Sequence, residues 1–179
     1  MNPTTKYKSN KLFMVVIHGP MGSGKTTLVD LLHDEIADTA HFGVDHIKRL
    51  VSDFRNVPSH IQVAKSMLPT MADGYLKQGI NCILEQAFTD MEINELEEVA
   101  KRYNAKFFVY RLDAQREVLN SRIVERTQRL GKPEVSKEHI DKSYEEYHQN
   151  IYNGGTLFDS EKMSIREIAD RILKDLGLV

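Results

Sequence analysis

The stretch Gly19-Pro20-Met21-Gly22-Ser23-Gly24-Lys25-Thr26-Thr27 follows an apolar run over residues 12–17 and opens a helical pattern over residues 28–37. Its spacing matches G-x-x-x-x-G-K-[ST], and its position between a strand and a helix is the context that this motif requires. The stretch therefore predicts a phosphate-binding loop. The alternative is a glycine-rich turn that happens to precede a helix, and eight matching positions in the correct context argue against it.

The residue types of this loop suit a nucleoside triphosphate. Its glycines let successive backbone N–H groups point at phosphate oxygens, and the N-terminus of the following helix adds its positive dipole end. Lys25 can reach the β- and γ-phosphates, and the hydroxyl of Thr26 can ligate Mg²⁺. We expect the neighbouring positions to contact the same phosphates. The nucleotide-binding residues within the loop are Gly19, Met21, Gly22, Ser23, Gly24, Lys25, Thr26 and Thr27.

Length and composition indicate the domain organisation and the general class of the protein. Its 179 residues suit one domain over residues 11–179, preceded by a flexible leader over residues 1–10 that lacks the apolar core of a signal peptide. A net charge of −2 argues against a protein that coats nucleic acid. Cys82 is the single cysteine, so we expect a buried thiol. With no apolar run of membrane-spanning length, we expect a cytoplasmic protein, as a monomer or homodimer.

Strand-like and helix-like patterns alternate along the chain. Repeated β-α units predict a five-stranded parallel sheet with helices on both faces, and its site at the carboxyl ends of the strands. Pro69 should kink or split one helix, and Ser59 and Ser136 are candidate N-caps. The expected strands are 12–17, 40–44, 80–85, 106–112 and 156–159, and the expected helices are 28–37, 47–54, 60–79, 92–103, 114–130, 136–150 and 164–176.

Together with the loop, three features give the chain a family resemblance: Val44-Asp45-His46-Ile47-Lys48-Arg49, Glu85, and a basic helix with Arg122 and Arg126. The chain resembles P-loop kinases of the group that holds polynucleotide 5′-kinases, zeta toxins and chloramphenicol phosphotransferase. The resemblance implies a P-loop NTPase fold, an α/β/α sandwich of three layers with a small helical LID over about residues 116–150. It also implies ATP and Mg²⁺ as cofactors. Only the loop motif is sharp; the others are short and degenerate.

Asp45 matches the position whose carboxylate, in the resembled kinases, accepts the proton of the acceptor hydroxyl. Such a base must lie within hydrogen-bond reach of that hydroxyl. The alternative is that Asp45 is the N-cap of the helix that begins near His46. Lys48 or Arg49 follows where relatives carry a substrate-binding arginine, and either can instead be a surface charge.

Glu85 ends an otherwise apolar strand, so its carboxylate should emerge at the edge of the site. Relatives commonly have Asp at this position. Glu85 could hold Mg²⁺ through water or contact the substrate, and the alternative is a plain glutamate at the end of a strand. Gln86 is a weaker candidate for a substrate contact.

Arg122, Arg126 and Arg129 share one helix face, because they stand at i, i+4 and i+7. They match the LID arginines that clamp the triphosphate in the resembled kinases, a task that suits the planar guanidinium. The alternative is a solvated basic face paired with Glu117 and Glu125. Residues 131–133, Gly-Lys-Pro, would form the hinge or tip of a closing lid.

Several weaker candidates complete the site. The resemblance places the adenine cradle at residues 156–161. His18 is expected to be packed against neighbouring strands, and the seven histidines show no metal-ligand spacing on a common helix face. Met67, Met71 and Tyr75 either line the acceptor pocket or fill the core, and Tyr144 and Tyr147 are core or groove residues.

The favoured function is ATP-dependent phosphoryl transfer to a hydroxyl of a small molecule: a metabolite, nucleoside or antibiotic. Asp45 would be the base, and Lys25, Arg122 and Arg126 would stabilise charge. A polynucleotide 5′-hydroxyl kinase is less favoured, because no aromatic-basic stripe is present. A nucleotide-binding regulator also stays open. A Ras-type GTPase is disfavoured, because the D-x-x-G and N-K-x-D motifs are missing.

Overall fold

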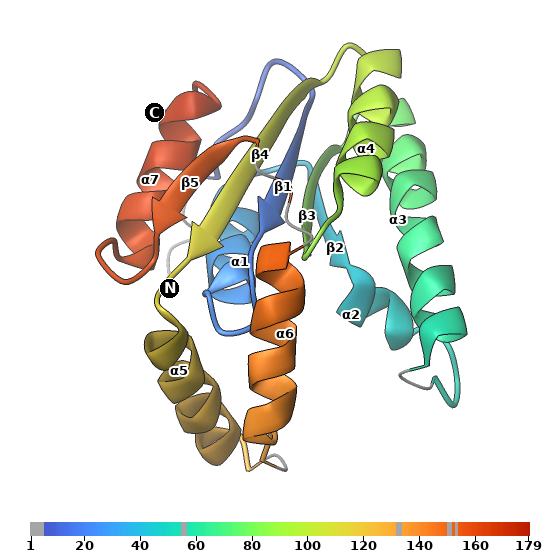
Figure 1. Cartoon of the computed structure of the whole chain (residues 1–179). Coiled ribbons are helices and arrows are strands. Elements are labelled where there is room, and N and C mark those ends of the chain that lie inside the picture. The colour runs from blue at the N-terminus through green and yellow to red at the C-terminus, as the bar shows by residue number, and fades with distance from the viewer. Residues whose placement is uncertain (1–5, 55–56, 132–133, 150–151, 153) are drawn as a thin grey trace.

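The computed structural model describes residues 6–54, 57–131, 134–149, 152 and 154–179. Five parallel strands form one sheet in the order β2-β3-β1-β4-β5. The predicted five-stranded parallel sheet is confirmed (Figure 1). The strands are β1 (Phe13–His18), β2 (Thr39–Gly43), β3 (Asn81–Gln86), β4 (Lys106–Asp113) and β5 (Thr156–Asp159).

Helices cover both faces of this sheet. The helices of the described residues are α1 (Lys25–Glu35), α2 (Val44–Lys48), α3 (Pro58–Lys77), α4 (Asp90–Arg102), α5 (Arg116–Arg129), α6 (Lys137–Gln149) and α7 (Ile165–Asp175). α1 and α7 pack together on one face, and α3 and α4 pack together on the other (Figure 1). The three predicted layers are therefore present.

The core has two halves, because successive side chains of a strand point to opposite faces of the sheet. All six residues of the central strand β1 are buried. Val15 and Ile17 pack with α1 and α7, whereas Met14 and Val16 pack with α3 and α4. This double burial fixes β1 in the middle of the sheet and so fixes the loop that follows it.

Two helices differ from the expected ranges. The helix predicted over residues 47–54 is wrong: α2 spans Val44–Lys48 and ends in turns, with Leu50 and Val51 exposed. Their apolar spacing therefore does not mark a core-facing helix. Pro69 does not split α3, which runs unbroken from Pro58 to Lys77. Its N-cap is Val57 rather than Ser59.

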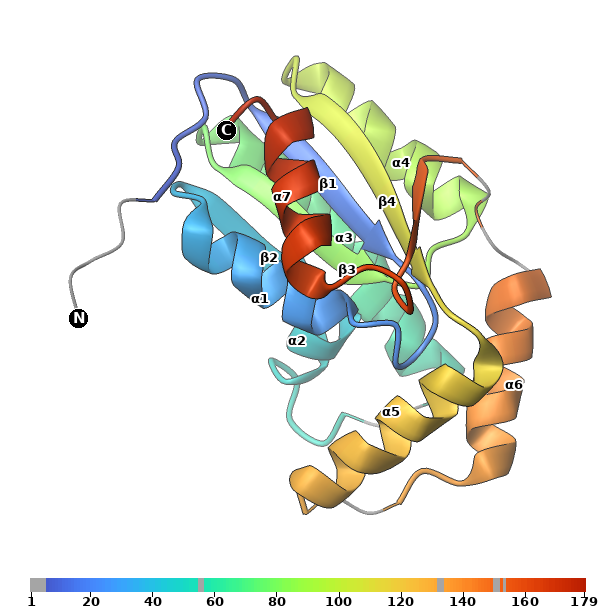
Figure 2. The ribbon, with the colours of Figure 1, turned by 90° about the vertical axis from the view of Figure 1, so that its left-hand side faces the viewer.

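The helices α5 and α6 lie beyond the carboxyl ends of the strands, apart from the helices that cover the sheet (Figure 2). Ser136 accepts a hydrogen bond from the backbone N–H of His139, as expected of the N-cap of α6. The expected lid tip includes residues 132–133, which lie outside the described residues.

In the segment expected to be a leader, the backbone of Tyr7 pairs with Glu35 and Ala37. Among the described residues, no helix combines the length and apolarity that crossing a membrane demands.

Candidate functional site

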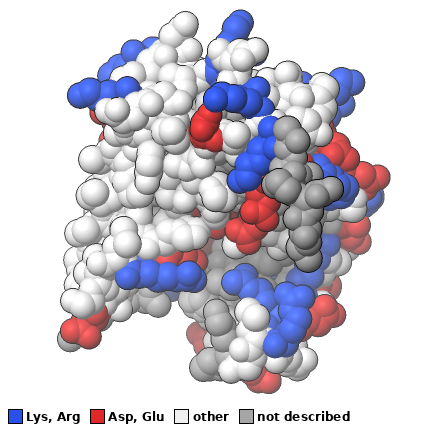
Figure 3. All heavy atoms as spheres, turned by 180° about the vertical axis from the view of Figure 1, so that it is seen from behind, with Lys and Arg blue, Asp and Glu red and all other residues white. Residues whose placement is uncertain are grey.

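A cavity of about 910 Å³ lies at the carboxyl ends of the strands. Its walls come from the β1–α1 loop, the start of α2, the end of β3, the helices α5 and α6, and the segment after β5. Seen from behind, the molecule is hollowed at its lower edge, with Lys and Arg side chains on both sides of the hollow (Figure 3). The topology therefore brings the polar ends of several strands to one place, as expected of a parallel sheet.

The loop that floors the cavity has the backbone geometry of an anion site. Gly22 and Gly24 have φ angles of 83° and 97°, a left-handed region that disfavours residues with a Cβ. Gly24 is also the N-cap of α1, and no side chain caps that end of the helix. The amides of the first turn are therefore available to an anion such as a phosphate.

Lys25 is held at the centre of this loop. Its ammonium group donates hydrogen bonds to the backbone oxygens of Gly19 and Pro20, both at 2.8 Å. Burial lowers the pKa of Lys25 to about 8, although the nearby carboxylates of Glu85 and Asp45 oppose the shift. The loop therefore places a partly buried cation where the phosphates of a nucleotide would bring compensating negative charge.

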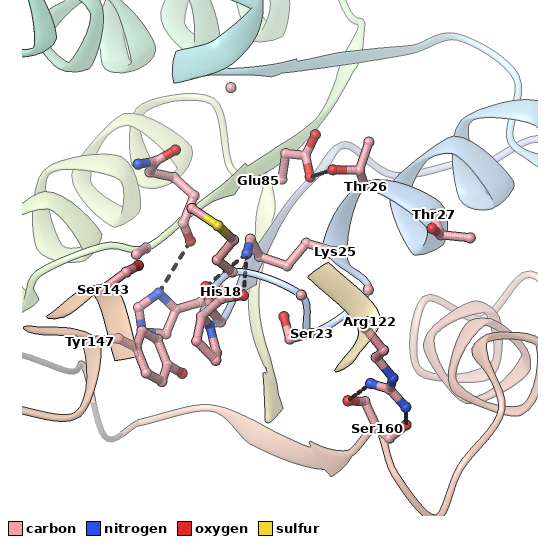
Figure 4. A pocket seen from close by; sticks show the side chains of 18 of the residues that line it. His18, Ser23, Lys25, Thr26, Thr27, Glu85, Arg122, Ser143, Tyr147 and Ser160 are labelled. Carbon is pink, nitrogen blue, oxygen red and sulfur yellow. Dashed lines mark hydrogen bonds between the residues drawn. The ribbon is translucent and has the colours of Figure 1, made fainter. Parts of the chain in front are cut away.

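Thr26 and Glu85 connect the loop to the end of β3. The hydroxyl of Thr26 donates a hydrogen bond of 2.9 Å to Glu85 Oε2 (Figure 4). His41 Nε2 lies 3.3 Å from Glu85 Oε1. Burial alone would raise the pKa of Glu85, but the hydrogen bonds from His41 and Thr26 and the charge of Lys25 lower it overall. A threonine hydroxyl and an ionised carboxylate side by side are oxygen donors of the kind that Mg²⁺ prefers.

Asp45 and Lys48 both line the cavity from α2. Lys48 Nζ lies 3.1 Å from Asp45 Oδ1, and the Asp45 side chain is 81% exposed, so its carboxylate is open to a ligand. Asp45 is not the N-cap of α2, because Gly43 occupies that position. Of the two basic candidates, Lys48 is in the cavity wall, and Arg49 is not among the residues that line it.

The arginines of α5 divide into two groups. Arg122, Arg126 and Arg129 line the cavity, as their common helix face predicts. Arg122 donates hydrogen bonds to the hydroxyl and the backbone oxygen of Ser160 (Figure 4). Arg126, by contrast, is exposed. Arg116 faces α6 instead, where it pairs with Glu145.

The wall opposite α5 differs from the expected acceptor pocket. Met67, Met71 and Tyr75 are not among the lining residues; α3 contributes Lys65 instead. Tyr75 packs its ring against Phe42, and Met71 packs against the core. Lys65 pairs with Glu92 at 2.8 Å. The helical spacing of Met67, Met71 and Tyr75 alone could not show which side of α3 faces the site.

His18 is buried as predicted, but it also lines the cavity beside Tyr147. Its Nδ1 accepts a hydrogen bond of 2.8 Å from the backbone N–H of Phe88. Burial lowers the pKa of His18 to about 4, so the ring is neutral near pH 7. A neutral histidine with Nδ1 as acceptor carries its proton on Nε2.

Ser160 and His41 are two of the residues that the sequence patterns did not single out. Ser160 fixes Arg122, and the only signal for it was its position after a strand, within the segment expected to hold adenine. His41 contacts Glu85, and the signal for it was a polar residue within a short strand. Both contacts depend on the pairing of strands far apart in the sequence.

Comparisons with known proteins agree with this architecture. The model of a family described as AAA domain matches residues 14–149, and the chain belongs to this family. No curated protein matches the chain.

Solved structures of three other proteins are similar in fold. A candidate kinase of Chloroflexus aurantiacus J-10-fl has a TM-score of 0.71 and 20% identity, over 93% of this chain and 97% of that one. The APS kinase CysC of Mycobacterium tuberculosis, in complex with AMPPNP and APS, has a TM-score of 0.63 and 20% identity, over 93% and 98%. The tunicamycin resistance protein of Deinococcus radiodurans has a TM-score of 0.60 and 18% identity, over 94% and 98%. The chain therefore has the fold of P-loop kinases.

Proposed function

We propose that this member of the AAA domain family is an ATP- and Mg²⁺-dependent phosphotransferase that moves the γ-phosphate to a hydroxyl of a small molecule. One observation carries the proposal: a single cavity is lined by the phosphate-binding loop, by Asp45 and by Arg126. A cation for the phosphates, a carboxylate for the acceptor proton and a second cation for the transferring group are the parts that phosphoryl transfer needs. The similarity in fold to an APS kinase that binds AMPPNP supports the choice of nucleotide.

In the proposed step, the acceptor oxygen forms a bond to the γ-phosphorus while the bond to the β,γ-bridging oxygen breaks. The hydroxyl proton passes to the Asp45 carboxylate, and ADP leaves. Asp45 suits this role because its side chain is exposed in the cavity wall and lies close enough to Lys25 to raise the pKa of that lysine. Lys48 donates a hydrogen bond to the same carboxylate and would keep it oriented.

Charge on the phosphates would be neutralised from two sides. Lys25 would release its contacts to Gly19 and Pro20 and bind the β- and γ-phosphates, while Arg126 approaches from α5. Arg122 is held in place by its hydrogen bonds to Ser160, so it would bind the nucleotide rather than act on the transferring phosphoryl group. Magnesium, held by Thr26 and by Glu85 directly or through water, supplies further positive charge when bound.

The acceptor is proposed to be a small molecule because of the charges around the cavity. Acidic side chains such as Asp45, Glu125 and Glu146 stand among the basic ones in its wall, and the whole chain has a net charge of −2. A groove for a polynucleotide backbone would be mainly basic. Gln86, Thr89 and Ser143 add neutral hydrogen-bonding groups, which suit a hydroxylated ligand.

The test is transfer of label from γ-labelled ATP with Mg²⁺ to two separate pools. One pool holds 5′-hydroxyl oligonucleotides, and the other holds hydroxylated metabolites, nucleosides and antibiotics. Label in the small-molecule pool is the expected result, and fractionation then identifies the acceptor. Label only on oligonucleotides would replace the proposal with a polynucleotide kinase. Tight ATP binding with label in neither pool would favour a nucleotide-binding regulator.

A further inference from the structure

We propose that His41, His46 and Glu85 form a binding site for a transition-metal ion such as Zn²⁺ or Co²⁺, separate from the Mg²⁺ position at Thr26. The three side chains come from β2, α2 and the end of β3. One possible ligand atom from each lies within 4.8 Å of the other two. The sequence hid this cluster, because its histidines do not share a helix face.

The geometry of the cluster is compact and largely shielded from water. The side chains of His41 and Glu85 are 8% and 10% exposed, and His41 Nε2 is 3.3 Å from Glu85 Oε1. The rings of His41 and His46 meet edge to face, with centroids 4.6 Å apart. Within the described part of the chain, His46 Nδ1 is buried and has no hydrogen-bond partner. A buried polar atom without a partner costs free energy, and a bound metal ion is one way to supply such a partner.

The donor set points to a particular class of ion. Two imidazoles and one carboxylate suit Zn²⁺, Co²⁺ and similar ions, whereas Mg²⁺ prefers oxygen ligands alone. Asp30 lies 4.0 Å from His41 Nδ1, on the side of the ring away from Glu85. A carboxylate at this position can orient the ring and raise its strength as a ligand.

Glu85 would serve both cation positions through different oxygens. Its Oε2 accepts the hydrogen bond from Thr26, and its Oε1 faces His41. A transition metal bound by the histidines can therefore leave the contact to the phosphate-binding loop in place. The proposed ion would lie beside the nucleotide site without using Thr26.

The experiment is titration of the untagged, full-length, nucleotide-free protein with Co²⁺, followed by its visible d–d absorption and by calorimetry. We expect one ion per chain, with the absorption band of histidine ligation, and competition by Zn²⁺ but not by Mg²⁺. His46→Ala should weaken binding at least about tenfold, the loss that removal of even an outer partner of a metal ligand causes. His139→Ala, an exposed histidine on α6, is the matched control and should bind like the wild type.

A second variant, His46→Gln, keeps a polar side chain of similar size and removes the imidazole, so the test survives if the alanine variant does not fold. The proposal is overturned if the wild type shows no histidine-ligated band, or if folded His46 variants bind Co²⁺ as tightly as the wild type. Because no nucleotide or acceptor is present, the result does not depend on the proposed phosphotransferase activity.

Discussion

The hydroxyl of Thr26 and the carboxylate of Glu85 are joined by a hydrogen bond of 2.9 Å, which ties the first turn of α1 to the end of β3. These residues stand 59 positions apart in the chain, and the parallel pairing of β1 with β3 brings them together. The contact couples the phosphate-binding loop to a buried carboxylate whose pKa is held below its ordinary value.

Glu85→Gln should raise the Mg²⁺ concentration needed for half-maximal transfer by roughly tenfold, as loss of a supporting group does at metal sites. The amide oxygen can still accept the hydrogen bond from Thr26, so the change removes mainly the negative charge. Mg²⁺ titrations of the transfer rate at saturating ATP measure the effect. Glu97→Gln, on the exposed side of α4, is the control. An unchanged Mg²⁺ requirement in Glu85→Gln would remove this residue from the metal site.

Nucleotide binding should take up protons near pH 8. Lys25 has a pKa of about 8 in the protein alone, and phosphate next to its ammonium group favours the charged form and raises that pKa. The bound state then holds more protons than the free state, so affinity should fall by roughly tenfold between pH 7 and pH 9. Uptake should be about 0.5 proton per site at pH 8. Calorimetry in two buffers of different ionisation enthalpy measures it.

Lys25→Arg is the matched control for this linkage, because arginine stays protonated over the whole range. Proton uptake should disappear in that variant, whatever happens to its affinity. Equal uptake in wild type and Lys25→Arg would assign the proton to another group.

Arg126→Ala should slow transfer by roughly 10²-fold or more, the usual loss when a charge-stabilising group is removed. The dissociation constant of ATP should change much less, because Arg126 is exposed in the nucleotide-free protein and lies on the wall of the cavity. Rate and equilibrium binding are measured on the same preparation. Arg171→Ala on α7, outside the cavity, should behave as wild type. A normal rate in Arg126→Ala would make this arginine a surface charge.

Arg122→Ala should act mainly on nucleotide affinity. Its guanidinium is already committed to Ser160, so it joins α5 to the segment after β5. Loss of this double contact should weaken ATP binding more than it slows transfer from the saturated enzyme. Fluorescence titration with a labelled nucleotide and saturation kinetics separate the two effects. Slower transfer with unchanged affinity would place Arg122 with Arg126 in the transfer step.

Local signals in the sequence were enough for the fold. The apolar run that became β1 has Met14 and Val16 on one face and Val15 on the other, which fits a strand that is buried on both faces. The loop motif then placed the nucleotide site. By contrast, α2 ended earlier than expected, because Leu50 turned out to be exposed. Periodicity shows which residues share a face, but not whether that face meets the core.

The site was harder to predict, because it depends on contacts across the sheet. The family resemblance predicted Asp45, which lines the cavity, but it left Lys48 and Arg49 as alternatives, of which only Lys48 lines it. Nothing local showed that His41 would face Glu85, since that contact needs the register of β2 against β3. Lys65, and not Met67, lines the cavity from α3, and this orientation of the helix likewise follows from packing.

The most direct test of the account is the initial rate of γ-phosphate transfer to the identified acceptor, for wild type and Asp45→Asn side by side, with the ATP dissociation constant of each. The account predicts transfer by the wild type, a loss of about 10²-fold or more in Asp45→Asn, and nearly equal ATP affinity. Equal transfer by the two proteins would contradict the role of Asp45. A wild type that binds ATP tightly and transfers phosphate to no acceptor would contradict the proposed activity itself.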